Sequence, residues 1–446
     1  MSMVNAFDPN RPADLDPEDM ALIERRNRAL GPAYKLFYEE PIHLVRGEGV
    51  WLYDKDGRAY LDAYNNVASV GHCHPKVVEA VSHQLGVLNT HTRYLHEGVV
   101  AYAERLLATM PQTTGNMALG HMMFTCTGSE ANDLALRITR AFTRRQGVIV
   151  TKLAYHGLTE AVAEISPSLG DFVPRGKRVR MIPAPNALFV PPAEQGARLA
   201  ADLAQAIAAM RADGIEPAAF IVDTIFSSDG LYPDPAGFLK PAVDLIRAEG
   251  GLFIADEVQP GFARTGEAFW GFQRHGVVPD MVTMGKPMGN GFPVAGVALR
   301  PELVAEFGAK TRYFNTFGGN PVACAAGMAV LDVIEEEGLL ENARDVGLYL
   351  KQGLTQLTAG RDDVGDVRGA GLFLAVECVE SRETNAPNAR MAASLVNHMR
   401  RNGVLISATG PGANILKIRP PLVLKKPEAD RFLASVEAAL SASRKV

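Results

Sequence analysis

One lysine, Lys286, stands alone among apolar, glycine and proline residues in the stretch MVTMGKPMGNGFPVAG. An ammonium group resists burial, and removing it from water lowers its pKa. Either this side chain extends out of an apolar surface, or its amine takes part in chemistry. A partly desolvated amine loses its proton more readily, and it therefore condenses more readily with an aldehyde. The stretch is a candidate site for covalent chemistry by an amine.

Two acidic residues occupy similar places at the ends of other apolar runs. Asp223 follows AAFIV and Asp256 follows GGLFIA, just as Lys286 follows DMVTMG. In an open parallel sheet, ligands bind beyond the carboxyl ends of the strands. Each residue alone is more often a helix cap or a paired surface charge. Together, the three predict one crevice that holds an amine and two carboxylates.

A phosphate site is suggested by FTCTGSEANDLALR, in which Thr127, Gly128 and Ser129 directly precede a predicted helix. Backbone N–H groups and hydroxyls at the positive end of a helix dipole are well placed to bind phosphate. This is not a nucleotide-binding P-loop, because no Gly-Lys-Ser/Thr follows. Taken alone, the Gly-Ser pair is more often a simple helix cap.

An aromatic residue and a histidine, Tyr155 and His156, lie just past a predicted strand in KLAYHG. The ring could stack on a planar ligand and the histidine could orient that ligand. A core aromatic residue followed by a turn is the simpler interpretation of the same pattern.

The cluster GHCHP, residues 71–75, contains two histidines and a cysteine. No further cysteine or histidine follows at a spacing typical of metal ligands, and the proline is placed to start a helix. We therefore expect no metal site here, and we expect His72 and His74 in a turn or at a helix cap.

The elements that must position these residues alternate along the chain from about residue 70 to about residue 325. Short apolar, β-branched runs alternate with amphipathic helical stretches, a pattern typical of a parallel sheet with crossover helices. In a helix predicted at 130–142, apolar residues recur at helical spacing, namely Ala131, Leu134, Ala135, Ile138 and Phe142. The predicted strands are 147–153, 218–226, 250–258, 280–285 and 292–300, and a second helix covers 238–250.

The two ends of the chain have a different pattern. A helix opens at Asp16 in a proline-rich first segment that is typical of an arm. The last part combines a helix at 330–354, a strand at 371–379 and a helix at 429–440. The sequence thus predicts an α/β fold with an N-terminal arm and part of a small domain (1–70), a large domain (71–325) and a C-terminal small domain (326–446).

The composition excludes several classes of protein. With 446 residues, 47% of them hydrophobic, the chain can bury a large core and is not expected to be disordered. The formal charge of −5, without long runs of one sign, indicates no basic patch that would bind nucleic acid. The 4 cysteines form no CxxC pair, and we expect neither a secretory leader nor a membrane-spanning run. We expect a cytoplasmic protein with small-molecule or protein partners.

These features occur together with a set of sequence blocks, namely NNVASVGHCHP, TGSEANDLALR, AYHG, FIADEVQPGFARTG, MGKPMGNG and FNTFGGNP. In this order and spacing the blocks resemble the class III aminotransferases, in the fold type I group of pyridoxal-phosphate-dependent enzymes, over essentially the full chain. The resemblance implies pyridoxal 5'-phosphate as cofactor and a large domain with a mainly parallel, seven-stranded-type sheet beside a smaller α+β domain. It also implies a homodimer with shared active sites, which could pair into a tetramer.

The resemblance further implies roles at the cofactor. Lys286 would attach the cofactor through a Schiff base and later move a proton between the substrate carbon and the cofactor. Asp256 would hydrogen-bond the pyridine nitrogen and keep it protonated, so that the ring withdraws electrons. Gln259 would approach the phenolic oxygen, and Tyr155 would stack on the ring.

The remaining cofactor candidates surround the phosphate and the ring. Gly128 and Ser129 would bind the phosphate through the helix start, and Thr316 would reach the phosphate of the other subunit's cofactor. The further candidates are Thr127, His156 and Asp223.

The substrate-binding residues depart from the common pattern. The closest likeness within class III is to the ethanolamine-phosphate phospho-lyase subgroup. Members that bind an α-carboxylate usually have an arginine three residues before a Pro-Pro pair, whereas NILKIRPPL places Lys417 there and Arg419 two residues later. Lysine makes a point-charge contact rather than a two-pronged one, which puts the usual carboxylate clamp in doubt. The substrate candidates are Asn66, Arg93, Lys417 and Arg419, and a structural ion pair is the alternative for Arg93.

Three functions fit this resemblance. The first is a transaminase that moves an amino group from a primary amine or ω-amino acid to a keto acid such as pyruvate. The second is a lyase that eliminates ammonia, phosphate or both from an amino-alcohol phosphate or a similar anionic amine. The third, a non-catalytic regulator of the same fold, is disfavoured because the first fifty residues are too short and too acidic for a DNA-binding domain.

Overall fold

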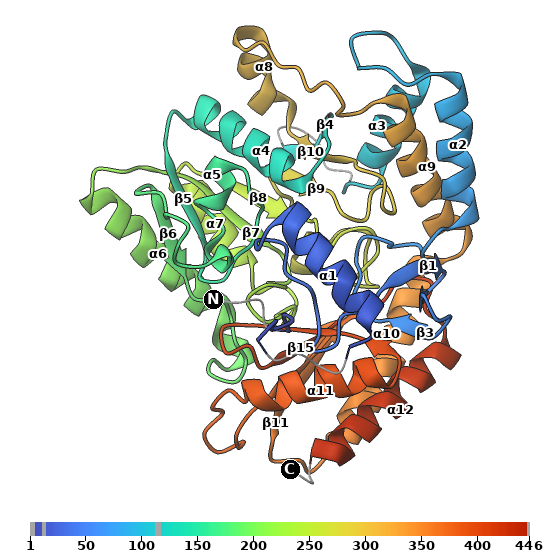
Figure 1. The fold of residues 1–446 in the computed structure, drawn as a ribbon. Helices are drawn as coiled ribbons and strands as arrows, with labels where there is room; N and C mark the ends of the chain where they lie inside the picture. Colours follow the sequence, from blue (N-terminus) through green and yellow to red (C-terminus); the bar gives the residue numbers. More distant parts are fainter. Residues whose placement is uncertain (1–4, 11–14, 112–116, 444–446) are drawn as a thin grey trace.

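A seven-stranded sheet forms the centre of the computed structural model, which describes residues 5–10, 15–111 and 117–443 (Figure 1). Its strand order is β4-β10-β9-β8-β7-β5-β6. Only β10 runs antiparallel to its neighbours, and the pairs from β9 to β6 are parallel. The strands are β4 (His121–Thr125), β5 (Gly147–Thr151), β6 (Val179–Ile182), β7 (Pro217–Asp223), β8 (Leu252–Asp256), β9 (Met281–Met284) and β10 (Ala295–Leu299). The predicted seven-stranded, mainly parallel sheet is confirmed.

Helices cover both faces of this sheet, as strands β5 and β7 to β10 require because they are buried along almost all of their length. The principal ones are α4 (Gly128–Thr143), α6 (Gln195–Ala212) and α7 (Lys240–Ala248). On β7, Ala219 and Ile221 lie in one apolar cluster with residues of α4. The alternating residues Phe220 and Val222 lie in a second cluster with residues of α6 and α7. The alternation of side chains along each strand thus supplies both layers of the core.

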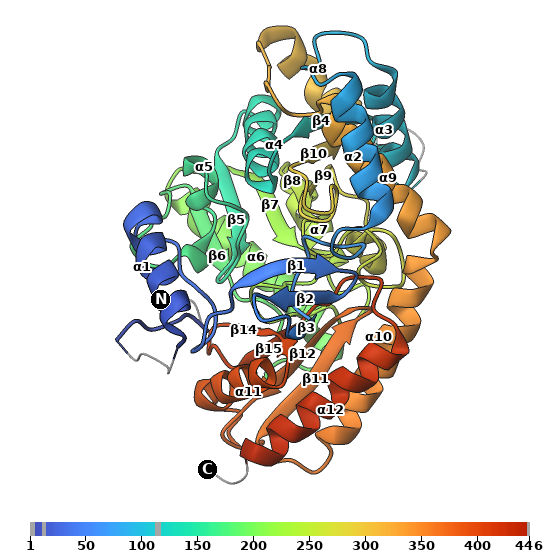
Figure 2. The ribbon, with the colours of Figure 1, turned by 45° about the vertical axis from the view of Figure 1, so that its right-hand side comes forward.

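Two four-stranded sheets are built from the two ends of the chain (Figure 2). The first contains β1 (Leu44–Glu48), β2 (Trp51–Asp54), β3 (Ala59–Asp62) and β13 (Val404–Leu405). The second is antiparallel and contains β11 (Val364–Ala370), β12 (Phe373–Cys378), β15 (Ile415–Ile418) and β14 (Ser407–Thr409). Because β13 pairs in parallel with β3, Val404 lies beside Leu61. Segments from both ends of the chain therefore meet next to the central sheet.

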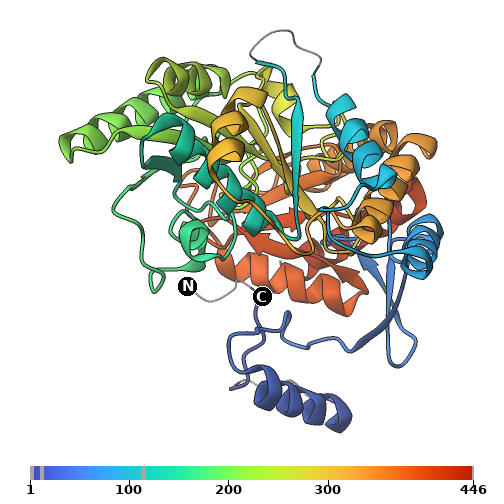
Figure 3. The ribbon, with the colours of Figure 1, turned by 90° about the horizontal axis from the view of Figure 1, so that it is seen from above.

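The other helices surround these three sheets. They are α1 (Pro17–Leu30), α2 (Pro75–Val87), α3 (Glu97–Ala108), α5 (Glu160–Ala163), α8 (Pro301–Lys310), α9 (Pro321–Glu336), α10 (Leu339–Leu357), α11 (Ala389–Arg401) and α12 (Lys426–Ser443). As predicted, α1 opens at Asp16, whose side chain accepts the Glu18 N–H at 2.7 Å, and the helix lies at one side of the body (Figure 3). No helix in the described ranges has both the length and the apolar character needed to cross a membrane.

Several sequence predictions differ from the structure. The helix predicted at 330–354 is two helices, because Gly338 has φ of 59°, in the left-handed region that a continuous helix does not contain. Phe142 was predicted on the apolar face of α4, but it is 40% exposed at the end of that helix. The strand within 292–300 is antiparallel rather than parallel. Strands β4 and β6 were not predicted, since each is short and has polar or half-exposed positions.

Candidate active site

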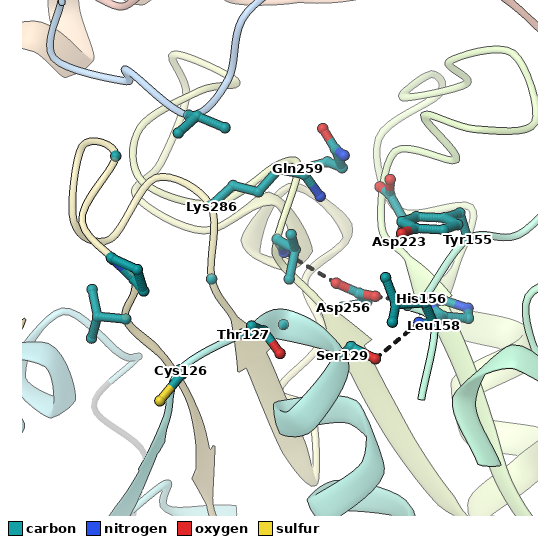
Figure 4. Close-up of a pocket in the computed structure, with 18 of the residues that line it drawn as sticks. Cys126, Thr127, Ser129, Tyr155, His156, Leu158, Asp223, Asp256, Gln259 and Lys286 are labelled. Atoms are coloured by element: carbon teal, nitrogen blue, oxygen red, sulfur yellow. Dashed lines mark hydrogen bonds and ion pairs between the residues drawn. The ribbon is translucent and has the colours of Figure 1, made fainter. Parts of the chain in front are cut away.

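A cavity of about 340 Å³ opens at the carboxyl ends of β7, β8 and β9 (Figure 4). Asp223 on β7 and Asp256 on β8 are neighbours in the sheet register, and Lys286 follows the last residue of β9 by two positions. All three residues line the cavity. The edge of the sheet therefore collects the amine and the two carboxylates at one place.

The other predicted site residues divide into two groups. Those that line the cavity together with the three strand-end residues are Thr127, Gly128, Ser129, Tyr155, His156 and Gln259. Those that do not contribute to its lining are Asn66, Arg93, Thr316, Lys417 and Arg419. The cofactor candidates thus gather around the cavity, with the exception of Thr316, and the substrate candidates lie outside it.

A buried network fixes the orientation of the Asp256 carboxyl group. Its Oδ2 lies 2.7 Å from His156 Nδ1 and accepts the Asn132 Nδ2–H at 3.0 Å. Its Oδ1 accepts the backbone N–H of Val258 at 3.1 Å. The Asn132 amide also donates to the His156 carbonyl at 2.8 Å and accepts the Thr283 hydroxyl at 2.7 Å. The only ring nitrogen of His156 left without a partner in the described structure is Nε2.

Asn132 and Thr283 are members of this network that sequence reasoning missed. Both side chains are fully buried, at 0% exposure. Asn132 lies on α4 directly after Ala131, on the side of the helix that packs against the sheet. A buried polar side chain on such a face needs a hydrogen-bond partner. An asparagine inside an apolar helix face was the available signal.

The start of α4 forms one wall of the cavity. Thr127 is the N-cap, with its hydroxyl accepting the Glu130 N–H at 3.1 Å and the Glu130 carboxylate accepting the Thr127 N–H at 3.0 Å. This reciprocal capping box fixes where the helix begins. Gly128 and Ser129 are its first two residues, whose N–H groups precede the first bonds within the helix. The arrangement offers a positive helix end to an anionic group at the cavity.

The loop after β5 packs tightly against this helix start. The Ser129 hydroxyl accepts the backbone N–H groups of Leu158 at 2.9 Å and Thr159 at 3.0 Å. Gly157 has φ of 142°, and a Cβ added there would lie 2.4 Å from Ser129 Oγ. Only glycine permits this approach, which holds Tyr155 at the cavity, where the residue is 38% exposed.

The surroundings of the Lys286 amine change its pKa. Burial lowers the pKa of Lys286, and the Arg419 charge lowers it further, while Asp256 and Asp223 oppose the change. The Nζ atom lies 5.9 Å from the centre of the Tyr155 ring. A lysine with a lowered pKa is more often neutral, and a neutral amine is the form that attacks a carbonyl carbon.

Asp223 is held by the turn that follows β7. Its Oδ1 accepts the Ile225 N–H at 3.1 Å, and its Oδ2 accepts the Ser227 N–H at 3.2 Å and the Ser227 hydroxyl. Burial raises the pKa of Asp223, whereas the bond from the Ser227 side chain lowers it. These short-range bonds fix the carboxyl group at the cavity wall.

A second carboxyl group in the same turn, Asp229, gives a prediction about pH and stability. Its oxygens accept the Thr151 hydroxyl at 2.6 Å and the Leu153 N–H at 2.9 Å, and burial raises its pKa from 3.8 to about 6. The stability that this raised pKa contributes is complete below pH 3.8 and is lost as the pH rises through 6. In Asp229→Asn both hydrogen bonds can persist, because the Thr151 hydroxyl can accept instead of donate.

We therefore expect Asp229→Asn to gain stability relative to the parent protein as the pH rises from about 4 to about 7, by roughly 3 kcal/mol at most. Melting temperatures of both proteins across this range measure the difference. Two parallel curves would contradict the prediction.

Of the two basic residues of the NILKIRPPL block, Arg419 is buried and Lys417 is partly buried. Lys417 Nζ donates to the Ser227 carbonyl at 3.4 Å. Burial lowers the pKa of Lys417 well below its usual value, Arg419 lowers it further, and Asp223 opposes this. Arg419 donates to the Tyr64 carbonyl and to the Gln259 side chain. Its guanidinium is thus engaged within the protein.

Arg93 and Thr316 lie together on an exposed surface rather than at this chain's cavity. The Arg93 guanidinium stacks 3.8 Å from the centre of the Phe314 ring, and His91 packs edge-on against the same ring at 5.5 Å. Thr316 is exposed two residues further along the same loop.

The histidines of GHCHP each contact a different carboxyl group instead of converging on one point. His72 Nε2 lies 2.7 Å from Asp62 Oδ2, and His74, at the N-cap of α2, lies 3.0 Å from Glu337 Oε1. Across the part of the chain that the structure describes, no group of three histidine, cysteine or acidic side chains is arranged to hold a metal ion.

Comparison with known proteins shows the family to which the chain belongs. The family model described as aminotransferase class-III matches residues 37–440, and the chain belongs to this family. It is 41% identical to the alanine–glyoxylate aminotransferase 2-like protein of Drosophila melanogaster, over 94% of this chain and 87% of that protein. It is 36% identical to ethanolamine-phosphate phospho-lyase homolog 1 of Caenorhabditis elegans, over 94% of this chain and 95% of that protein.

Solved structures show the same fold. A phospholyase from Arthrobacter in complex with phosphoethanolamine is 43% identical and superposes with a TM-score of 0.89, over 94% of this chain and 99% of that one. A Bacillus anthracis aminotransferase is 26% identical with a TM-score of 0.87, over 96% and 100% of the two chains. The protein is therefore an enzyme of the fold type I group, whose members use pyridoxal 5'-phosphate.

The residues of the cavity fit this cofactor. The cofactor has an aldehyde, an aromatic ring with a nitrogen, a phenolic oxygen and a phosphate. The cavity presents a lysine of lowered pKa, a fixed carboxyl group, an exposed tyrosine ring and a helix start. His156 Nε2, buried and without a partner, adds a polar atom beside the carboxyl group.

Proposed function

We propose that this enzyme is a lyase that releases phosphate and ammonia from a small amino-alcohol phosphate. The observation that carries this proposal is Lys417, which is partly buried near Asp223 at the position where relatives that bind an α-carboxylate usually have arginine. The other basic residue of the block, Arg419, is engaged by the Tyr64 carbonyl and by Gln259. A transaminase must also bind the carboxylate of a keto acid, and the usual two-pronged clamp for it is lacking here.

A substrate anion would relieve an electrostatic cost that the folded chain carries. Arg419 is buried, Lys286 and Lys417 are partly buried, and desolvation lowers the pKa of all three groups. None of the three forms an ion pair with a carboxylate among the described residues. A phosphate group near Lys417 would offset this lost hydration. The 43% identity with a phospholyase solved with phosphoethanolamine supports the same class of substrate.

The proposal includes roles for the cofactor residues. Lys286 binds the cofactor and moves the substrate proton, and Asp256 holds the ring nitrogen. Tyr155 covers the ring, and Gly128 and Ser129 hold the phosphate. When bound, the cofactor withdraws electrons from the carbon that carries the substrate amine.

Transamination is the second candidate function. The 41% identical Drosophila relative is named as an alanine–glyoxylate aminotransferase 2-like protein, and several solved neighbours are described as transaminases. A lysine can still attract a keto-acid carboxylate as a point charge. Both functions use the same cofactor residues. The lyase expels a leaving group from the substrate, whereas the transaminase passes the amino group to a keto acid.

We also propose a homodimer with shared active sites, in which the loop with Thr316 reaches the partner's cofactor. The supporting surface is exposed and apolar, with Leu95 at 103% and Phe317 at 70% exposure, and with Arg93 stacked on Phe314 close to Thr316. Exposed apolar residues of this size on neighbouring loops mark an interaction surface.

Two broader expectations remain part of the proposal. The division into segments 1–70, 71–325 and 326–446 is supported by the distribution of strands, since the central sheet lies wholly within the second segment. A cytoplasmic location is supported by four free cysteines, two of them buried, which suit a reducing compartment.

The reaction is tested with a panel of amino-alcohol phosphates, ω-amino acids and simple amines, each with and without pyruvate. Free phosphate, ammonia and alanine are measured for each compound. The lyase proposal expects phosphate and ammonia from an amino-alcohol phosphate without any keto acid. Alanine formed only with pyruvate, and without phosphate release, would replace it with the transaminase.

A further inference from the structure

Gln259, which lines the cavity, is held by two residues from outside the central sheet. Asn66, which follows β3, donates its amide N–H to the backbone carbonyls of Val258 at 3.2 Å and Gln259 at 3.4 Å. Arg419, which follows β15, donates from Nη1 to the Gln259 side-chain oxygen. Both of these residues were expected to contact substrate, and in this structure both contact Gln259.

Arg419 is itself firmly anchored. It is 4% exposed, and its Nε and Nη2 atoms donate to the Tyr64 carbonyl at 3.1 and 2.9 Å. Its backbone N–H donates to the Ala63 carbonyl at 2.6 Å. The guanidinium lies 5.2 Å from the centre of the Tyr64 ring and 5.3 Å from that of Phe373. These contacts leave it one direction for Nη1, which is toward Gln259.

The chemistry of the two groups decides how the Gln259 amide is turned. A guanidinium group only donates hydrogen bonds, so the amide atom that faces Arg419 must be the oxygen. The amide nitrogen of Gln259, with its two N–H bonds, is then the end left free to serve the cavity. No hydrogen bond from this nitrogen occurs within the described structure.

We propose that Arg419 is a positioning residue, which turns the Gln259 amide so that its N–H groups, not its carbonyl, face the phenolic oxygen of the bound cofactor. The inference rests on the proposed use of the cofactor and on the role that the class III resemblance implies for Gln259, and it is independent of whether the enzyme acts as a lyase or a transaminase. An amide that turned freely would present its oxygen to the phenolic oxygen in part of the molecules, and two acceptors repel each other.

The effect of the Gln259 orientation on the bound cofactor can be measured in the enzyme without substrate. An N–H donor stabilises negative charge on the phenolic oxygen, which makes the adjoining lysine-bound nitrogen a weaker base. The visible absorbance of the lysine-bound cofactor changes when this nitrogen loses its proton. Loss of the donor should therefore raise the pH midpoint of that absorbance change.

Charge must be separated from positioning, because the Arg419 charge also lowers the pKa of Lys286. A double-mutant cycle separates the two. Arg419→Met and Gln259→Leu are each expected to raise the midpoint by about one pH unit, the scale of one hydrogen bond to a charged group. If Arg419 acts by turning Gln259, adding Arg419→Met to the Gln259→Leu variant should cause little further shift in the pH midpoint. A full, additive shift in that background would mean that Arg419 acts by charge alone and would overturn the proposal.

Three further variants sharpen this experiment. Lys417→Met is the matched control, since it removes a buried cation that does not contact Gln259, and any shift it causes should persist in the Gln259→Leu background. Arg419→Lys keeps a hydrogen-bond donor, so its pH midpoint should lie between those of the parent enzyme and Arg419→Met. Arg419→Gln serves if Arg419→Met does not fold, because its amide can still bond the Tyr64 carbonyl but is too short to reach Gln259 as well.

The outcomes also distinguish this inference from the proposed function. Arg419→Gln with an unchanged midpoint overturns the inference, whichever products the enzyme releases. A product panel that favours the transaminase overturns the lyase proposal and leaves the midpoint cycle as expected. A parent enzyme without the visible band would overturn the assignment of Lys286 and this inference with it.

Discussion

Lys286→Ala is expected to abolish both the covalent attachment of the cofactor and turnover, with a loss of activity of about 10⁴-fold or more. The reason is that one amine serves as the attachment point and as the base at the substrate carbon. The variant should fold normally, because removing a buried amine without a carboxylate partner also removes a desolvation cost. Visible absorbance and substrate turnover of the purified variant test this.

The matched control is Lys152→Ala, which removes an exposed lysine that follows β5 and does not line the cavity. It should keep the visible band and the rate of the parent enzyme. If the Lys286 variant retained the band, the attachment would lie at another amine, and Lys417 would be the first alternative because burial lowers its pKa as well.

Asp256→Asn should bind the cofactor and still lose about 10³-fold in kcat/KM, the scale on which one fixed polar group stabilises developing charge. The substitution removes the negative charge that would keep the ring nitrogen protonated. It also places an amide N–H among donors, since Oδ2 of the aspartate faces the His156 ring and the Asn132 amide. A rate within a few-fold of the parent would remove Asp256 from the electron-withdrawing role.

Asn132→Ala is the companion variant for this residue. Asn132 donates a hydrogen bond to Asp256 and does not line the cavity, so it would act on the cofactor only through Asp256. It should therefore lower kcat/KM by much less than Asp256→Asn, and adding it to the Asp256 variant should have little further effect. Equal losses from the two single variants would mean that Asn132 has a role of its own at the cavity.

The placement of the central residues could be foreseen because it follows from local patterns. Asp223, Asp256 and Lys286 each end a short apolar run, and parallel strands bring such ends to one edge. The start of α4 was equally visible, because Thr127 and Glu130 stand at the spacing of a capping box. These predictions need only the sequence within a few residues of each site.

The residues that support the cavity could not be foreseen in the same way. Arg419 meets Gln259 across 160 positions, and Asn132 meets Thr283 across 151. Neither pairing leaves a periodic signal, because each depends on the geometry of separate elements. The helix break at Gly338 was hidden for a related reason, since the acidic run before it has good helical propensity.

The pairing of β3 with β13 has a consequence for how the enzyme is made. All seven strands of the central sheet lie between residues 121 and 299, so they can assemble before the ribosome has finished the chain. Residues 404 and 405 of β13, and Arg419 after β15, emerge after all strands of the central sheet. The Gln259 amide therefore gains its contact with Arg419 only after every strand of the central sheet has been made, when residues 404–419 reach residues 59–66.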